Sequence, residues 1–206
     1  MQFNKSYTPS VASTTFWNAA TITGDGPWTP TTTSTTDSLA HATTMTVATS
    51  NFSDRTFLFT GTDADGNAQT ESIAGPNNNT ITLTKLFRTI TSVSKTAGAA
   101  LATNNVSLGI TAVCCSQSIG LEKYSVAPAA VAVDISGTIN FDIEETPEDF
   151  YNTPQQNGFW ANNGNFTAQT ADKGGVVSQS MRCLRLYINS HSGSATARVS
   201  VAHAVR

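Results

Sequence analysis

The feature that most restricts the fold of this sequence is a strict alternation of apolar and polar residues between positions 131 and 144. The apolar set is Val131, Val133, Ile135, Ile139, Phe141 and Ile143, and the polar set is Asp134, Ser136, Thr138, Asn140, Asp142 and Glu144. Successive side chains of a β-strand point to opposite faces of the sheet. A period of two therefore predicts one half-buried strand, or a pair of strands kinked at Gly137.

Shorter alternating segments lie on both sides of this stretch. Residues 57–73 predict a hairpin whose turn contains Asp65-Gly66-Asn67, because these residue types tolerate positive φ. Residues 80–84 and 106–110 alternate in the same way, and residues 87–95 predict a strand with a bulge. A C-terminal hairpin is also predicted, with a turn at residues 190–194 and inward-facing Leu184, Leu186, Ile188, Val199 and Val201.

No run of helical periodicity separates these strands, which excludes an α/β fold and predicts an all-β chain. About six strands precede residue 113, enough for a small sandwich. We expect two small antiparallel β-sandwich or jelly-roll-like domains, at residues 37–120 and 121–206, after an extended N-terminal arm at residues 1–36. Residues 37–42 are either a short helix or a turn, with Asp37 as its cap.

The expected arm is rich in proline and threonine and has almost nothing to bury. It nevertheless contains Phe16, Trp17 and Trp28. Large aromatic residues in a segment without a core of its own commonly anchor it against another surface. We therefore treat these three as candidate interface residues. The alternative is that they fold back on their own domain.

A second candidate interface lies in the long loop from residue 145 to about residue 171, which is rich in Asn, Gly and Pro. It contains Phe150, Tyr151, Phe159 and Trp160. Loops commonly carry binding function, and clustered aromatic residues are typical of protein interfaces. The alternative is that these side chains close one end of their own sandwich.

The charge content is low, because Asp, Glu, Lys and Arg make up only 12 % of the residues and the net charge is −3. A typical soluble protein has about 25 %. A surface of hydroxyls and amides has a small desolvation cost when neighbouring subunits cover it, so this composition favours a subunit of an assembly. The alternative is an extracellular polar protein that is rich in threonine.

Targeting and partner signals are absent from the sequence. We expect no signal peptide, and no stretch approaches the roughly 18 apolar residues of a membrane span. A pI of about 5.5, without a cluster of Lys and Arg, predicts neither nucleic acid nor a membrane as a partner. Cys114, Cys115 and Cys183 are an odd number of cysteines, so we expect reduced, buried thiols, with an inter-subunit disulfide as the alternative.

Residue spacing also bears on metal binding and catalysis. Counting from Asp63, Gly66 is fourth and Ala74 is twelfth, where an EF-hand calcium loop needs glycine sixth and an acidic residue twelfth. The acidic cluster is Asp142, Glu144, Glu145, Glu148 and Asp149. A glycosidase would need two such carboxylates, but the alternation places Asp142 and Glu144 on a solvent-facing strand surface. We therefore expect no enzyme activity, no catalytic residue, no metal and no cofactor.

Three stretches resemble the small all-β virion structural proteins of tailed bacteriophages. They are residues 59–71 (FTGTDADGNAQTE) followed by residues 80–94, residues 136–146 (SGTINFDIEET), and residues 181–190 (MRCLRLYINS). The resemblance extends over residues 56–95 and 130–206, and the Cys114-Cys115 pair departs from it. It implies a virion structural component without an enzymatic role.

The resemblance does not say which component this is. Our leading expectation is a capsid decoration or cement protein that stabilises the head by bridging capsomers through the arm and the aromatic loops. The alternatives are a neck, collar or tail protein, and, from a different class, a carbohydrate-binding receptor module. The expected partners are further copies of the chain in a symmetric oligomer, with a trimer as the first expectation, and the major capsid or other virion proteins. The expected location is the virion, assembled in the host cytoplasm.

Overall fold

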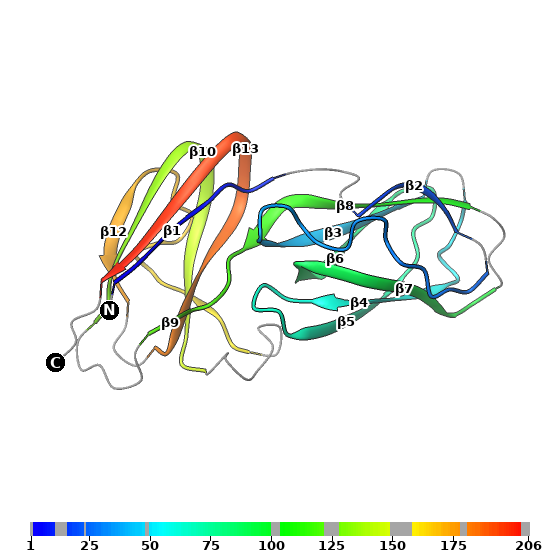
Figure 1. Cartoon of the computed structure of the whole chain (residues 1–206), viewed down its shortest axis with the longest axis horizontal. Helices are drawn as coiled ribbons and strands as arrows, with labels where there is room; N and C mark the ends of the chain where they lie inside the picture. Colours follow the sequence, from blue (N-terminus) through cyan, green and yellow to red (C-terminus); the bar gives the residue numbers. More distant parts are fainter. Residues whose placement is uncertain are drawn as a thin grey trace. The chain divides into compact units, whose positions relative to one another are not determined.

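The computed structural model describes residues 2–10, 16–22, 24–47, 50–99, 104–121, 128–148, 158–177 and 181–202. Every regular element in these ranges is a β-strand, which confirms the all-β fold (Figure 1). Within the same ranges there is no helix long and apolar enough to cross a membrane. The chain forms two compact units: unit 1 contains Met1–Ser10 and Ala112–Arg206, and unit 2 contains Val11–Thr111.

Unit 2 consists of two sheets. The first contains β2 (Trp17–Ile22), β8 (Asn104–Cys115), β3 (Ala40–Val47) and β6 (Thr80–Phe87) in that order, and the second contains β5 (Ala68–Ala74), β4 (Thr56–Thr62) and β7 (Thr89–Ala97). The inward-facing residues of both sheets form one buried apolar cluster, as in a β-sandwich. Its members are Phe16, Trp17, Ile22, Met45, Val47, Phe52, Phe57, Phe59, Leu83, Phe87, Ile90, Val93, Val106, Leu108 and Ile110.

The hairpin predicted at residues 57–73 is confirmed by the antiparallel pairing of β4 with β5. Asp63 is buried, and its Oδ1 accepts hydrogen bonds from the backbone N–H groups of Asp65 and Asn67, both at 2.9 Å. Gly66 has a φ of +89°, a region that glycine enters without steric cost. The Asp63 carboxylate therefore shapes a tight turn.

The strand predicted at residues 87–95 is divided between the two sheets. β6 ends at Phe87 and β7 begins at Thr89, so the chain crosses from one sheet to the other at Arg88. The predicted bulge is present within β7, because Gly61 pairs with Ile90 and Thr60 with Ser92, which leaves Thr91 as the extra residue. This bulge explains why Ile90 and Val93 are both buried although they are three residues apart.

Side chains close the sandwich where β5 lies against β6. The Glu71 carboxylate accepts hydrogen bonds from the backbone N–H groups of Thr84 and Lys85, at 2.8 and 2.9 Å. Lys85 Nζ donates to the Thr70 carbonyl at 2.6 Å, and Gln69 Nε2 donates to the Leu86 carbonyl at 2.7 Å. Thr84 Oγ1 also donates to Glu71 Oε1 at 2.7 Å, so five hydrogen bonds join the two sheets at this edge.

Unit 1 is built around two long strands, β10 (Ala130–Thr146) and β13 (Cys183–Ala202), which are antiparallel from Ala130 opposite Ala202 to Thr146 opposite Cys183. The other edge of β10 pairs with β11 (Ala161–Asn162) and β12 (Lys173–Val176). The other edge of β13 pairs with β1 (Gln2–Tyr7), β9 (Ile119–Gly120) and the last two residues of β8.

The predicted apolar face of β10 is confirmed at five of its six positions, and Ile135 is half-buried. Val131, Val133, Ile139, Phe141 and Ile143 are all buried. The strand continues through Gly137, which has a φ of +81° and lies at a shift in the register with β13. The pattern therefore belongs to one strand with an irregularity at Gly137, and both long strands bend over in the upper part of Figure 1.

The predicted C-terminal hairpin is wrong. Residues 190–192 pair with residues 138–140 of β10, so the expected turn lies inside β13. The polar residues and Gly193, with a φ of +57°, accommodate a bend in one strand instead of a reversal of the chain. Because β10 pairs with β13 on both sides of the bend, at residues 190–192 and 196–202, the chain continues as one strand.

The two units also differ from the expected domains. The boundary falls near residue 112 instead of residue 120, and the expected arm is divided between the units. Gln2–Tyr7 pairs with β13, and Trp17–Ile22 pairs with β8. Thr35 N donates to the Arg88 carbonyl at 3.0 Å. Residues 36–38 form bends before β3, and Asp37 Oδ1 accepts from Leu39 N at 3.1 Å, so this segment is a turn and not a helix.

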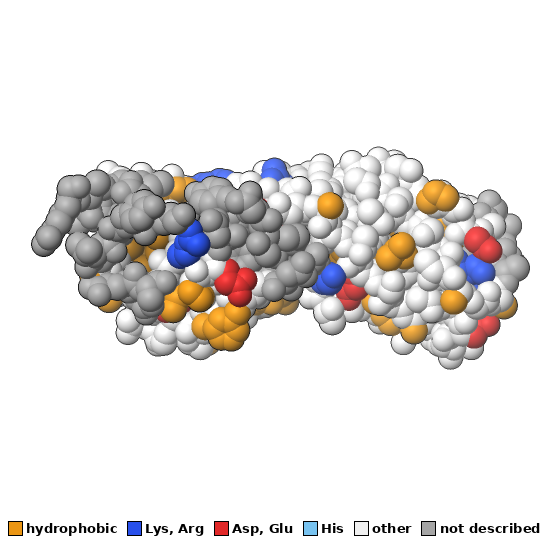
Figure 2. Space-filling model, turned by 90° about the horizontal axis from the view of Figure 1, so that it is seen from below, with side chains coloured by type: hydrophobic (Ala, Val, Ile, Leu, Met, Phe, Trp, Pro, Cys, Tyr) orange, Lys and Arg blue, Asp and Glu red, His pale blue; other side chains and the backbone are white. Residues whose placement is uncertain are grey.

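The three cysteines are buried, as expected from the sequence. Charged side chains are scattered singly or in small groups among uncharged atoms on the face drawn in Figure 2. The described part of this face therefore has the low charge density that the composition predicted.

Candidate functional site: an aromatic surface beside Arg185

Arg185 is the centre of a cluster of interacting side chains in the described part of unit 1. It lies on β13 between the buried residues Leu184 and Leu186, so the alternation of the strand directs its side chain to the opposite face. In the β10–β13 register it is opposite Glu144. Arg185 Nε donates to Glu144 Oε2 at 2.6 Å, and the two side chains are 12 % and 14 % exposed. A pair this shielded from solvent is more than a surface salt bridge.

Aromatic rings cover the Arg185 guanidinium. Its central carbon lies 4.2 Å from the centroid of the Trp160 ring and 5.8 Å from that of Tyr187. Nη1 also donates to Cys115 Sγ at 3.9 Å. A guanidinium stacked on indole is attracted by the negative face of the ring, and this contact strengthens when water is excluded. Arg185 therefore fixes Trp160 against the sheet.

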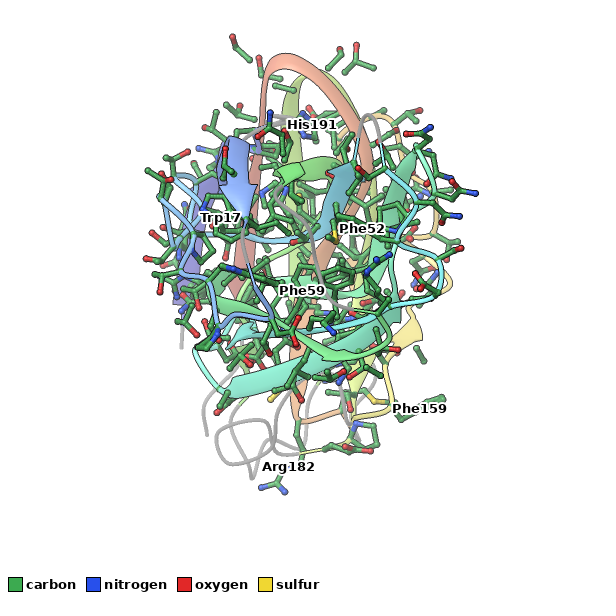
Figure 3. All side chains as sticks on the ribbon, turned by 90° about the vertical axis from the view of Figure 1, so that its right-hand side faces the viewer. Trp17, Phe52, Phe59, Phe159, Arg182 and His191 are labelled. Atoms are coloured by element: carbon green, nitrogen blue, oxygen red, sulfur yellow. The ribbon has the colours of Figure 1, made fainter. Side chains whose placement is uncertain are left out.

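Phe159 is the most exposed large apolar side chain among the described residues, at 65 %. It precedes the fixed Trp160, and its backbone N–H donates to Glu148 Oε1 at 3.1 Å. The side chain projects away from the ribbon in Figure 3. An apolar ring is thus presented to solvent on a backbone held from two sides.

The pKa of Tyr187, a residue of the same cluster, is raised. Burial, and next the Glu144 carboxylate and Cys115, raise the pKa of Tyr187 above its ordinary value of 10.0, while Arg185 opposes them. The phenol is therefore protonated at neutral pH and is not activated as a base or nucleophile. Together with the Glu144–Arg185 pair, this describes a cluster suited to holding a surface in place.

Tyr187→Phe should make the protein less sensitive to alkali. Because the folded pKa of Tyr187 is raised, the folded state binds this proton more tightly than the unfolded state, so stability falls as pH rises above 10. The substitution removes that loss and leaves neutral-pH stability nearly unchanged. Urea unfolding at pH 7 and above pH 10 measures both, and an equal alkaline loss in the wild type and the variant would contradict the buried phenol.

The carboxylates of the acidic cluster that the structure describes bind donors of the same chain. Asp142 accepts from Ala168 N and, at 2.9 Å, from Asn189 Nδ2. Glu145 Oε2 accepts from Asn163 Nδ2 at 3.0 Å. Asp142 is buried, and the prediction that it faces solvent is wrong, because residues 163–169 lie along β10 and pair with it through Phe141 and Ile143. Asp149 lies outside the described residues.

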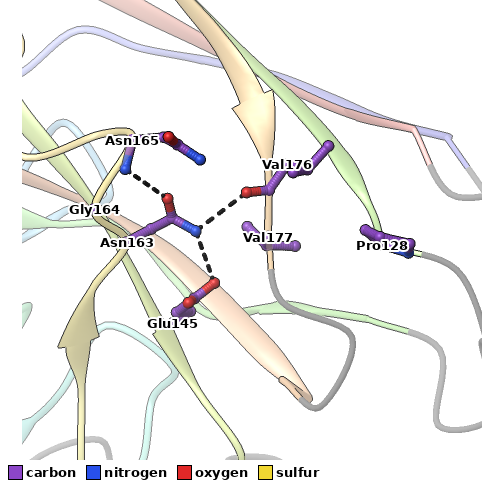
Figure 4. A pocket seen from close by; sticks show the side chains of 7 residues that line it. All are labelled: Pro128, Glu145, Asn163, Gly164, Asn165, Val176 and Val177. Atoms are coloured by element: carbon purple, nitrogen blue, oxygen red, sulfur yellow. Dashed lines mark hydrogen bonds between the residues drawn. The ribbon is translucent and has the colours of Figure 1, made fainter.

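A surface pocket of about 350 Å³ lies beside this segment, lined by Pro128, Glu145, Asn163, Gly164, Asn165, Val176 and Val177 (Figure 4). The Asn163 amide connects its polar residues: Nδ2 donates to Glu145 and, at 3.2 Å, to the Val176 carbonyl, and Oδ1 accepts from Asn165 N at 3.0 Å. This network fixes the connection between β11 and β12.

The other candidate interface residues are distributed differently. Phe16 and Trp17 are 1 % and 5 % exposed and belong to the unit 2 core. For these two residues the alternative applies, in which the segment folds back on its own domain. Trp28 is partly buried, with its ring centroid 6.5 Å from that of Phe57. Phe150 and Tyr151 lie outside the described residues. The structure therefore brings together Phe159 and Trp160, and it adds Arg185, which the sequence analysis did not select.

No protein-family model matches this chain, and no curated protein matches it either.

Proposed function

We propose that this chain is a non-enzymatic structural subunit of a tailed-bacteriophage virion, and specifically a capsid decoration or cement protein that stabilises the head by bridging capsomers. The observation that carries the proposal is the exposed Phe159 ring beside Trp160, which Arg185 fixes to the sheet. Exposed aromatic residues on a rigid support are typical anchors of protein–protein interfaces, because little conformational entropy is lost when a partner covers them.

The low charge content supports a role in an assembly. Only 12 % of the residues are charged, and Glu144 and Glu145, which an enzyme could use, are bound to Arg185 and Asn163 of the same chain. Covering such a surface removes few unpaired charges from water. A subunit that binds between capsomers benefits from this, since several small contacts then add up to a stable attachment.

Binding to purified phage heads that lack this chain tests the proposal. The wild-type chain is expected to bind and to raise the temperature at which the heads disrupt, because a ligand that binds only the intact head stabilises it. Phe159→Ser should weaken binding by about 2 kcal/mol, roughly 30-fold in Kd, as for a hot-spot residue. Its unfolding free energy should not change, since the ring is 65 % exposed.

Val176→Ser is the matched control, because Val176 is also an exposed apolar residue of unit 1, at 51 %. It should leave binding to heads unchanged. Binding to tails or necks instead of heads would replace the decoration role by the neck or tail role. Failure to bind any of these particles, or equal binding by Phe159→Ser, would overturn the proposed interface.

A further inference from the structure

One edge of β13 is divided among three partners. Cys183 and Leu184 pair with β9, Tyr187 and Ile188 pair with β8, and residues 197–202 pair with β1. The opposite edge of β13 pairs with β10 from Cys183 to Ala202, with interruptions at Asn189 and at residues 193–195. Without β1, the backbone groups of residues 197–202 would form an open sheet edge, which a strand of six residues fills exactly in register.

β1 fits this edge through one face and through its backbone. The six register pairs extend from Gln2 opposite Ala202 to Tyr7 opposite Ala197. Tyr7 is 3 % exposed, whereas Gln2, Asn4 and Ser6 face outward. Lys5 Nζ lies 5.1 Å from the centroid of the Tyr7 ring and 3.4 Å from Gln117 Oε1. Each of these contacts outside β1 is with a residue of the 112–206 segment.

β1 is separated in sequence from the remainder of unit 1. After Ser10 the chain enters unit 2, and it returns to unit 1 only at Ala112. The acceptor edge on β13 is therefore formed by a different part of the chain from the strand that fills it. A β1 strand from a second copy presents the same residues in the same register, so the acceptor edge cannot distinguish the two.

We infer that β1 is an exchangeable strand, and that β1 of one copy pairs with β13 of a second copy when copies are concentrated. β1 makes the same contacts whether it pairs with β13 of its own chain or of a second copy. The ratio of the two pairings therefore depends on the effective concentration of the neighbouring copy's β1. Such strand addition supplies main-chain hydrogen bonds between subunits without any new interface. The inference concerns self-association and does not rest on the proposed attachment through Phe159.

Cysteine pairs in the full-length chain test the exchange. Asn4 and Ser200 are register partners, so Asn4→Cys in one chain and Ser200→Cys in a second, size-tagged chain place two thiols opposite each other only if the strand crosses between copies. The two chains are unfolded, refolded together at high concentration and oxidised. A disulfide-linked heterodimer is expected on a non-reducing gel. The wild-type chain, whose three thiols are buried, is oxidised alongside.

Ser6→Cys mixed with Ala202→Cys is the matched control. Ser6 pairs with Arg198 and Ala202 pairs with Gln2, so these thiols are four residues out of register, roughly 13 Å apart at the rise of a β-strand. This mixture should give only the background of random collisions. The inference is overturned if the in-register mixture gives no more heterodimer than this control. The effect of Phe159→Ser on head binding does not depend on strand exchange. A failure of this inference can therefore be distinguished from a failure of the proposed function.

Discussion

Gly61→Ala is expected to destabilise unit 2 by about 3 kcal/mol or more, as for strong overpacking of a core. A β-carbon on Gly61 would lie 1.9 Å from the Thr89 carbonyl oxygen and 2.8 Å from its carbonyl carbon. Both are backbone atoms of β7, which pairs with β4 at this point beside the bulge at Thr91. Because backbone cannot rotate out of the way, β4 and β7 would have to separate, and the buried Ile90 beside them would lose its packing.

Urea unfolding followed by tryptophan fluorescence measures this effect, since Trp17 and Trp28 both lie in unit 2. Gly164→Ala is the control, because a β-carbon there meets no atom within 4 Å. It should change stability by no more than about 0.5 kcal/mol, as surface substitutions usually do. Wild-type stability in Gly61→Ala would mean that the two strands do not approach each other as closely as the structure has them.

His41→Ala should have a comparably large effect, about 3–5 kcal/mol, as expected when a buried carboxylate loses its hydrogen-bonded partner. His41 is fully buried, and the Asp37 side chain is 4 % exposed. His41 Nδ1 lies 3.0 Å from the Thr111 carbonyl oxygen, which can only accept, and Nε2 lies 2.7 Å from Asp37 Oδ2. The ring therefore connects the turn before β3 to β8, and its loss leaves a carboxylate and a carbonyl buried without this donor.

A double-mutant cycle with Asp37→Ala isolates the contribution of the pair. The double variant should be less destabilised than the sum of the two single variants, because removing both groups leaves no buried carboxylate behind. Asp37→Ala alone also removes the hydrogen bond from Leu39 N, so it should cost additional stability in either background. Strictly additive effects in urea unfolding would show that the two side chains are not energetically coupled.

Local patterns in the sequence predicted the elements whose structure is decided locally. The alternation over 131–144 predicted β10, and the Asp-Gly-Asn turn predicted the β4–β5 hairpin, since backbone hydrogen bonds to Asp63 require only neighbouring residues. The turn expected at 190–194 was wrong for a non-local reason. Its composition favours a reversal, but β10 provides partners for Ser190, His191 and Ser192 and again from Thr196 onward, so the strand continues.

The candidate site was only partly predictable for the same reason. Clustered aromatic residues indicated Phe159 and Trp160, but the burial of Phe16 and Trp17 depends on β8, about 90 residues later, where Leu108 pairs with Trp17. Arg185 was missed because its partners Glu144 and Cys115 are 41 and 70 positions away. The one local signal was a charged residue between two apolar ones in a strand.

The pairing of Gln2 with Ala202 has a consequence for the order in which the protein is made. Translation at about 5–20 residues per second releases β1 first and its partner β13 last, on the order of ten seconds or more later. Unit 2 is complete once residue 111 has left the ribosome, whereas unit 1 cannot close until nearly the whole chain is synthesised. Throughout that interval the nascent chain carries β1 without its partner strand.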